Sequence, residues 1–138
     1  MGIHFFTEKV KNPVKKKSEL IKWIKMSILE EEKIPGNINF IFCDDEYLLK
    51  LNRKKLGHDY YTDIITFDLS ENKNEISGDI YISVDSARNN SKEYNQSFTD
   101  EISRLMIHGV LHLIGYNDKN GKGKKLMTDK ENLYLTKK

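Results

Sequence analysis

The sequence predicts an α+β fold, in which a mixed sheet of about four strands packs with about five helices. Short β-branched and aromatic segments alternate with longer segments whose apolar residues recur at helical spacing. Two strand-like segments are joined by only a short polar link, and one helical segment is apolar on nearly every side. At 138 residues the chain is expected to form a single domain over residues 1–138, long enough to bury a core.

The chain is predicted to begin with a strand and an amphipathic helix. Residues 2–6 are apolar and aromatic, which is typical of a strand. Asn12 and Pro13 resemble an N-cap followed by a proline at the first helical position, and apolar residues then recur at helical spacing. We expect a helix of about five turns that ends before Pro35.

A second strand and a second helix are predicted next. Residues 37–43 are β-branched and aromatic with partial alternation, which predicts a strand. Asp44 can cap the helix that follows. That helix is expected to end near a basic cluster, Arg53, Lys54 and Lys55. Cations are favourable at a helix C-terminus in their own right.

The third and fourth strands are predicted to pair as a hairpin. Residues 62–69 and 76–84 predict strands, and the link between them, residues 70–75, is polar and turn-like. Asp63 and Asp79 are acids inside these largely apolar segments. A buried carboxylate needs a hydrogen-bond or charged partner. Each acid therefore either fastens a loop or serves as a general base in a cleft.

Three helices are predicted to complete the fold. Asp85 can cap a short helix, and Ser97 or Thr99 can cap the next one. Residues 102–114 are apolar on nearly every side, which predicts a helix buried at the centre of the domain. Residues 124–135 predict a last helix that docks through leucine and methionine.

The central helix carries His108 and His112 four residues apart, so both imidazoles point to the same side. Gly115 supplies the positive φ that commonly ends a helix, and the chain can then fold back and bring Asp118 to the same ion. Two imidazoles and one carboxylate suit a single Zn²⁺, with a fourth position left for water. Spacing alone leaves open that both histidines are satisfied core residues. Gly109 stands where the common zinc-protease motif has a glutamate, so any general base must come from elsewhere.

Charge is unevenly distributed along the chain. The net charge is +2, but residues 1–26 hold seven lysines and two acids, and residues 119–138 again hold seven lysines and two acids. The intervening residues 27–118 hold nine basic and seventeen acidic side chains. Basic ends beside an acidic cleft could bind a polyanion. Alternatively, the surface lysines only keep a small protein soluble.

The sequence favours a cytoplasmic protein. It contains no run of about 18 apolar residues, so we expect no membrane span. Its first residues show neither the basic start nor the apolar core of a signal peptide. Cys43 is the only cysteine, so no intramolecular disulfide can form, and its expected role is that of a small buried side chain.

Three blocks carry the most specific signals: residues 108–116 (HGVLHLIGY), residues 51–67, and residues 78–83 (GDIYIS). They resemble motifs of the YbeY family of endoribonucleases. The first block resembles the family's H-G-x-L-H-L-x-G-Y-D-H, the second resembles L-N-x-x-Y-R-x-K-D-x-P-T-D-V-L-S-F, and the third resembles G-D-I-x-I-S. The resemblance implies a metal-dependent endoribonuclease that cuts single-stranded RNA. It also implies a role in 16S ribosomal RNA 3′-end maturation and ribosome quality control, with ribosomal RNA and the small ribosomal subunit as partners.

The resemblance departs at two positions. The family's third metal-binding histidine falls at Asp118, and aspartate is a competent zinc ligand. The family's arginine in the second block, implicated in RNA handling, falls at Leu56. We predict RNA contacts for these basic residues: Arg53, Lys54, Lys55 and Arg88. Arg88 could instead pair with a carboxylate of the cleft.

Two other functions stay open. One is a metal-dependent hydrolase of another class, such as an amidase or a peptidase, although the missing glutamate after His108 argues against it. The other is a non-enzymatic ribosome-assembly factor whose metal is structural. Structural sites usually fill all four positions with protein ligands, and no cysteine lies near the histidines in the sequence to do so.

Overall fold

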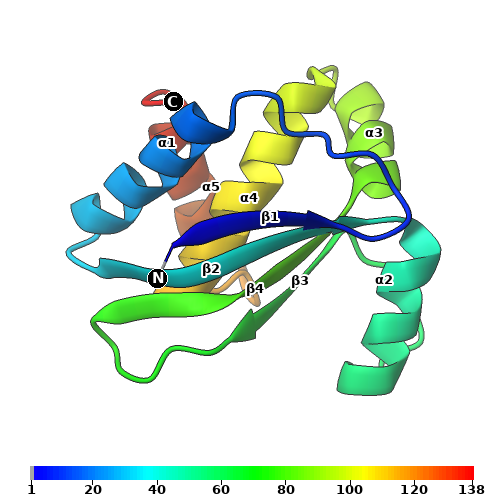
Figure 1. Ribbon diagram of the computed structural model, residues 1–138, viewed down its shortest axis with the longest axis horizontal. Helices are drawn as coiled ribbons and strands as arrows, with labels where there is room; N and C mark the ends of the chain where they lie inside the picture. Colours follow the sequence, from blue (N-terminus) through cyan, green and yellow to red (C-terminus); the bar gives the residue numbers. More distant parts are fainter. Residues whose placement is uncertain (1) are drawn as a thin grey trace.

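Four strands form one mixed sheet in the order β1-β2-β4-β3 (Figure 1). The computed structural model describes residues 2–138. β1 (Ile3–Thr7) and β4 (Glu75–Ser83) run parallel to β2 (Ile34–Cys43), whereas β3 (Ile64–Asp68) is antiparallel to β4. The predicted α+β class, the mixed sheet and the hairpin of β3 and β4 are therefore confirmed.

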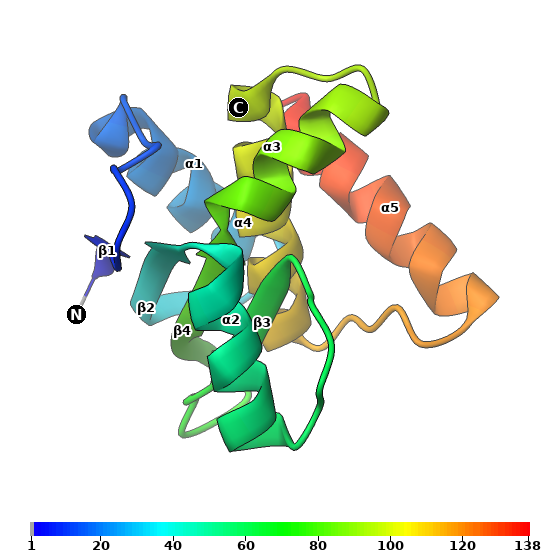
Figure 2. The ribbon, with the colours of Figure 1, turned by 90° about the vertical axis from the view of Figure 1, so that its right-hand side faces the viewer.

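Within residues 2–138, five α-helices and one π-helical turn accompany the sheet. They are α1 (Lys17–Glu30), α2 (Asp45–Leu51), the π-helical turn η1 (Asn52–Leu56), α3 (Val84–Glu93), α4 (Phe98–Ile114) and α5 (Gly121–Leu135). α1 and α4 lie on the same side of the sheet, and α5 packs against α4 on the side away from the sheet (Figure 2). The predicted order of strands and helices is confirmed.

The start of α1 and the role of Pro35 differ from the prediction. Asn12 Oδ1 accepts a hydrogen bond from Val14 N at 2.9 Å, so Asn12 forms a local turn and the helix begins only at Lys17. Pro35 lies inside β2, next to a shift in the register with β4. A proline is tolerated there because it stands near the start of the strand, beside a bulge.

Side-chain caps start four of the helices. Asp44 and Ser97 cap α2 and α4 as predicted. Ser83, not Asp85, caps α3, because Asp85 Oδ2 instead accepts a hydrogen bond from the backbone of the neighbouring α2. Asn120 caps α5 through Gly123 N, so this helix begins three residues earlier than predicted.

α4 is the buried centre of the fold, as predicted. Gly109 lies where α4 crosses the sheet, and a Cβ there would lie only 2.7 Å from Ile80 Cγ2. The close approach that glycine permits places the two histidines of α4 beside β3, at the edge of the sheet. The main core therefore fixes the helix that carries the predicted metal ligands.

A smaller apolar cluster lies on the other face of the sheet, beneath α2. It consists of Cys43, Leu48 and Ile65, with partly buried aromatic residues around them. Burial, followed by the charges of the nearby aspartates, raises the pKa of the Cys43 thiol to about 12. Cys43 is thus a buried, unreactive side chain, in agreement with the expected structural role. No helix within residues 2–138 has the length and apolar character needed to cross a membrane.

Candidate metal centre

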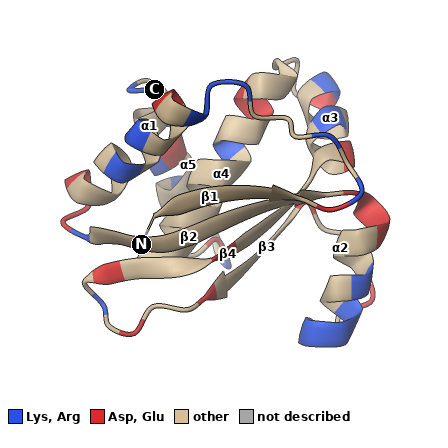
Figure 3. Cartoon of the chain, viewed as in Figure 1, with Lys and Arg blue, Asp and Glu red and all other residues tan. Residues whose placement is uncertain are grey.

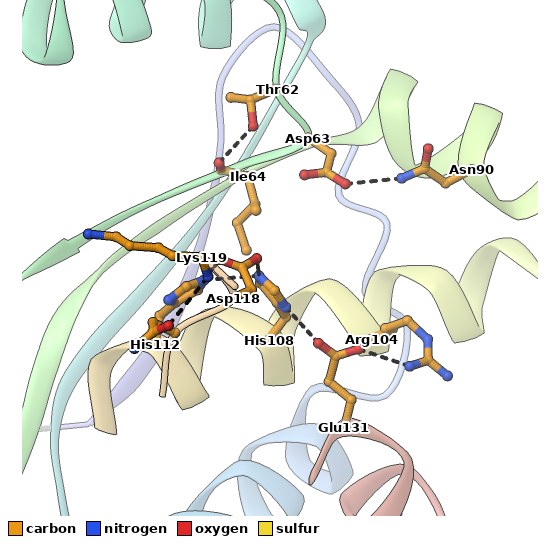
Figure 4. Close-up of polar contacts among 11 residues, drawn as sticks. Thr62, Asp63, Ile64, Asn90, Arg104, His108, His112, Asp118, Lys119 and Glu131 are labelled. Carbon is orange, nitrogen blue, oxygen red and sulfur yellow. Dashed lines mark hydrogen bonds and ion pairs between the residues drawn. The ribbon is translucent and has the colours of Figure 1, made fainter. Parts of the chain in front are cut away.

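Two histidines of α4 and one carboxylate of the following loop converge on one point (Figure 4). His108 Nε2 and His112 Nε2 are 3.1 Å apart. α4 ends at Gly115, whose φ is 127°, and the chain turns back toward the helix. Asp118 Oδ2 then lies 3.6 Å from His108 Nε2, and Asp118 Oδ1 lies 3.8 Å from His112 Nε2. The structure thus brings the three predicted ligands together.

The spacing of these donor atoms fits one metal ion. Ligand atoms held about 2.0–2.1 Å from zinc at tetrahedral angles lie about 3.3 Å from one another. The two imidazole nitrogens are 3.1 Å apart, and the nearest carboxylate oxygens lie 3.6 Å from His108 and 3.8 Å from His112. One donor atom from each residue lies within 4.8 Å of the other two, so small side-chain shifts would bring the set around one ion. All three side chains are partly exposed, so the position opposite the protein ligands is open. The set can therefore hold a metal ion and leave a coordination position for another molecule.

An acid from the last helix holds the other ring nitrogen of His108. Glu131 Oε2 lies 2.6 Å from His108 Nδ1, and Arg104 Nη1 donates to Glu131 Oε1 at 2.9 Å. Arg104 Nη2 also donates to Asn132 Oδ1 at 2.9 Å. A His108 ring that donates from Nδ1 presents its Nε2 lone pair to the point shared with His112, which is the tautomer that binds a metal.

The two imidazoles have opposite pKa shifts. Burial lowers the pKa of His108, but the hydrogen bond that His108 donates to Glu131 and the charges of Glu131 and Asp118 outweigh burial, so the pKa of His108 is raised. Burial, followed by the charge of His108, lowers the pKa of His112. Because only neutral imidazole binds a metal, a proton competes with the metal less strongly at His112 than at His108.

A polar cavity of about 670 Å³ is lined in part by two of the three ligands, His108 and Asp118. Its acidic, basic and histidine lining residues are Asp63, Glu101, Arg104, His108, Asp118 and Glu131. Asn90 Nδ2 donates to Asp63 Oδ2 at 3.1 Å and to Glu101 Oε2 at 3.3 Å. Burial, together with the charges of Asp63 and Glu131, raises the pKa of Glu101. The volume lies in the range of small-molecule and cofactor pockets, so a substrate group can enter beside the metal position.

The remaining predicted residues lie in different places. Asp63 lines the cavity, but Asp79 lies on the opposite face of the sheet, where its Oδ1 accepts a hydrogen bond from Asn39 Nδ2 at 3.0 Å. Arg88 stacks over the ring of Phe98, with 4.3 Å between its guanidinium carbon and the ring centroid. The basic cluster Arg53, Lys54 and Lys55 is exposed on η1. Of these two predicted acids, only Asp63 lines the cavity that His108 and Asp118 also line.

Glu131 and Arg104 were missed by the sequence analysis, although each left a signal. Arg104 lies one turn before His108 on the same side of α4. Glu131 lies between the buried Met127 and Tyr134 at helical spacing, so an acid occupies the inner face of α5. A buried acid requires a partner, but its identity depends on how α5 packs against α4.

Fold and site together define an α+β protein with a three-residue metal centre of two histidines and one aspartate, set at the wall of a polar cavity. The family model described as endoribonuclease YbeY matches residues 3–138. The chain therefore belongs to the endoribonuclease YbeY family, as its motifs predict.

Proteins of the same family are similar over nearly the whole chain. The endoribonuclease YbeY of Bacteroides fragilis is 46% identical over 135 residues, which cover 98% of this chain and 96% of the relative. That of Karelsulcia muelleri is 50% identical over 114 residues, which cover 83% of this chain and 80% of the relative. A solution structure of a Thermotoga maritima protein is similar with a TM-score of 0.63 and 30% identity, covering 96% of this chain and 86% of that one.

Proposed function

We propose that the chain is a metal-dependent endoribonuclease that hydrolyses phosphodiester bonds in single-stranded RNA. In this proposal His108, His112 and Asp118 hold one Zn²⁺. The observation that carries the proposal is the convergence of these three donors at the wall of a cavity, in a chain whose relatives are named endoribonucleases. We further propose that residues 1–138 act as one domain in the cytoplasm. The substrate would be ribosomal RNA on the small ribosomal subunit, in 16S 3′-end maturation and ribosome quality control.

A bound zinc ion, Glu131 and Asp63 would have different roles in the proposed hydrolysis. A zinc ion at this site would supply a Lewis acid for a phosphoryl oxygen and would favour deprotonation of water. Glu131 would keep His108 in the ligating tautomer through the 2.6 Å contact with Nδ1. Asp63 lines the same cavity, and we propose that its carboxylate accepts the proton of the attacking oxygen.

The number of ligands favours hydrolysis over a purely structural metal. Among residues 2–138, the converging donor set consists of three residues, whereas structural zinc sites are usually closed by four protein ligands. Glu131 does not close the set, because it faces the Nδ1 side of His108 rather than the point shared with His112. The open position is what a catalytic site requires.

Replacing one ligand tests the proposal. We expect His112→Ala to lose stoichiometric metal and RNA cleavage while keeping a folded far-ultraviolet circular dichroism spectrum. His4→Ala is the matched control, since His4 is an exposed histidine of β1 outside the site. The measurements are elemental analysis and cleavage of labelled RNA, with a peptide substrate in parallel. Full RNA cleavage by metal-free His112→Ala, or cleavage of the peptide alone, would contradict the proposal.

The cellular role needs its own measurement. Cells depleted of the protein should accumulate small-subunit ribosomal RNA with unprocessed 3′ ends, detected by end mapping. Expression of the wild-type chain should restore the mature end, whereas expression of His112→Ala should not. A mature 3′ end in depleted cells would remove the ribosomal assignment and leave the nuclease assignment untouched.

A further inference from the structure

Basic and aromatic side chains gather on η1 and the loop that follows it. We call this surface the stacking loop and define it by these residues: Arg53, Lys54, Lys55, His58, Tyr60 and Tyr61. All six are exposed. Figure 3 shows lysine and arginine gathered at the end of α2 and the turn after it. The metal ligands of α4 and the cavity lining do not include any of these residues.

The two tyrosine rings are exposed but held in place. Tyr60 and Tyr61 have 56% and 57% of their surface exposed, yet the hydroxyl of Tyr61 donates to Glu46 Oε1 at 2.7 Å. Tyr60 stacks on His58 with 5.2 Å between ring centroids, and its hydroxyl lies 3.0 Å from His58 Nδ1. Aromatic rings fixed at one end and open to solvent are suited to stacking against a flat ligand.

The backbone of the loop is fixed as well. Asn52 is buried, and its Nδ2 donates to the carbonyl of Tyr60 at 2.9 Å. The carbonyl of Asn52 accepts from His58 N at 3.2 Å, and Gly57 turns the chain with a φ of 68°. A platform that is ordered before binding loses little conformational entropy when a ligand arrives.

The stacking loop leads directly into the cavity wall. Tyr61 stands two residues before Asp63, so their Cα atoms lie at most about 7 Å apart along the chain. Asp63 lines the cavity together with His108 and Asp118. A single RNA strand that lies on the loop would therefore reach the wall of the cavity that His108 and Asp118 also line.

We propose that the stacking loop binds the bases of single-stranded RNA on Tyr60 and Tyr61, while Lys54 and Lys55 contact its phosphates. This inference rests on the proposed function, because it names the surface that delivers the substrate to that site. Single-stranded nucleic acid is bound by this combination of aromatic faces and cations. A duplex buries the faces of its bases, so it offers nothing to stack on the two rings.

RNA binding without cleavage tests the inference. Anisotropy of a fluorescein-labelled oligoadenylate of about 12 nucleotides would be measured in chelator, so that hydrolysis plays no part. We expect Tyr60→Leu/Tyr61→Leu to bind about 25-fold or more weakly, since each of the two stacked bases is worth about 5- to 150-fold. Tyr60→Phe/Tyr61→Phe keeps both rings and loses only their hydroxyl contacts, so it should bind far more tightly than the leucine variant.

Two further variants complete the design. Phe6→Leu is the matched control, because Phe6 is an aromatic residue with 51% of its surface exposed on β1, at the other edge of the sheet. It should bind like wild type. Lys54→Gln/Lys55→Gln should reduce the slope of log affinity against log salt by about 1.4, which corresponds to two lost phosphate contacts.

The outcomes separate this inference from the proposed function. Wild-type affinity in the double leucine variant would overturn the inference, even if the wild-type chain cleaves RNA. Failure of the wild-type chain to bind oligoadenylate would also overturn it. Binding that is lost in the leucine variant and kept in the phenylalanine variant supports the platform, even if the wild-type chain never cleaves RNA.

Discussion

Glu131→Gln is expected to weaken metal binding without unfolding the protein. Both partners of Glu131 are hydrogen-bond donors: His108 Nδ1 contacts one oxygen at 2.6 Å and Arg104 Nη1 the other at 2.9 Å. A glutamine offers only one acceptor oxygen, so one of the two donors loses its partner whichever way the amide turns. The His108 ring is then held less firmly in its orientation, and the negative charge beside its Nδ1 is lost.

The expected loss can be stated from this geometry. Removing the carboxylate that orients a metal-binding histidine typically costs 10- to 100-fold in metal affinity, or about 1.4–2.7 kcal/mol. α5 should stay docked, because Trp23 Nε1 donates to the carbonyl of Tyr134 at 2.8 Å and Lys130 pairs with Glu31 at 3.0 Å. Both contacts are independent of Glu131.

Competition titration of zinc against a chromogenic chelator measures the affinity directly. Asp129→Asn is the matched control, since it removes one carboxylate from an exposed position of the same helix. It should bind zinc like wild type. A zinc affinity of Glu131→Gln within twofold of wild type, with a lowered melting temperature of the metal-free protein, would show that Glu131 only holds α5 in place and would refute the reasoning.

Three other predictions concern stability. Burial, with nearby negative charge, raises the pKa of Glu101, so its ionised form destabilises the fold once the pH rises above that pKa. Glu101→Gln should therefore raise the denaturant midpoint near pH 7, and this gain should vanish as the pH falls to about 4, the ordinary glutamate range. Gly109→Ala should lower the free energy of unfolding by about 1–2 kcal/mol, because its Cβ would lie 2.7 Å from Ile80 Cγ2 and overpacking outweighs the gain in helix propensity; an unchanged or higher midpoint would contradict this. Chelator should lower the melting temperature of wild type, since a ligand at one hundred times its Kd stabilises by about 2.7 kcal/mol, whereas His112→Ala should not respond.

Elements whose pattern is local were predictable from the sequence. The apolar helix around His108 and His112, the stop at Gly115 and the return of Asp118 all follow from short-range rules, and the structure reproduces them. The caps Asp44 and Ser97 were also recognisable, since each accepts a hydrogen bond from a nearby backbone amide.

Features that depend on packing between elements were not predictable. The strand residue Asp79 looked like a possible base, but the face of the sheet to which it points depends on register. Asp63 was equally ambiguous, and only the docking of α3 and α4 beside it shows that it borders the cavity. The contact of Glu131 with His108 joins residues 23 positions apart on two helices, so no local pattern reports it.

The contact between α5 and His108 has a consequence for synthesis of the chain. During translation α4 is made before α5, so a nascent chain that has just completed α4 and the Asp118 loop has all three ligands but lacks the carboxylate behind His108. Such an intermediate should bind zinc only weakly. The metal affinity of the complete chain should therefore depend on whether α5 is docked against α4.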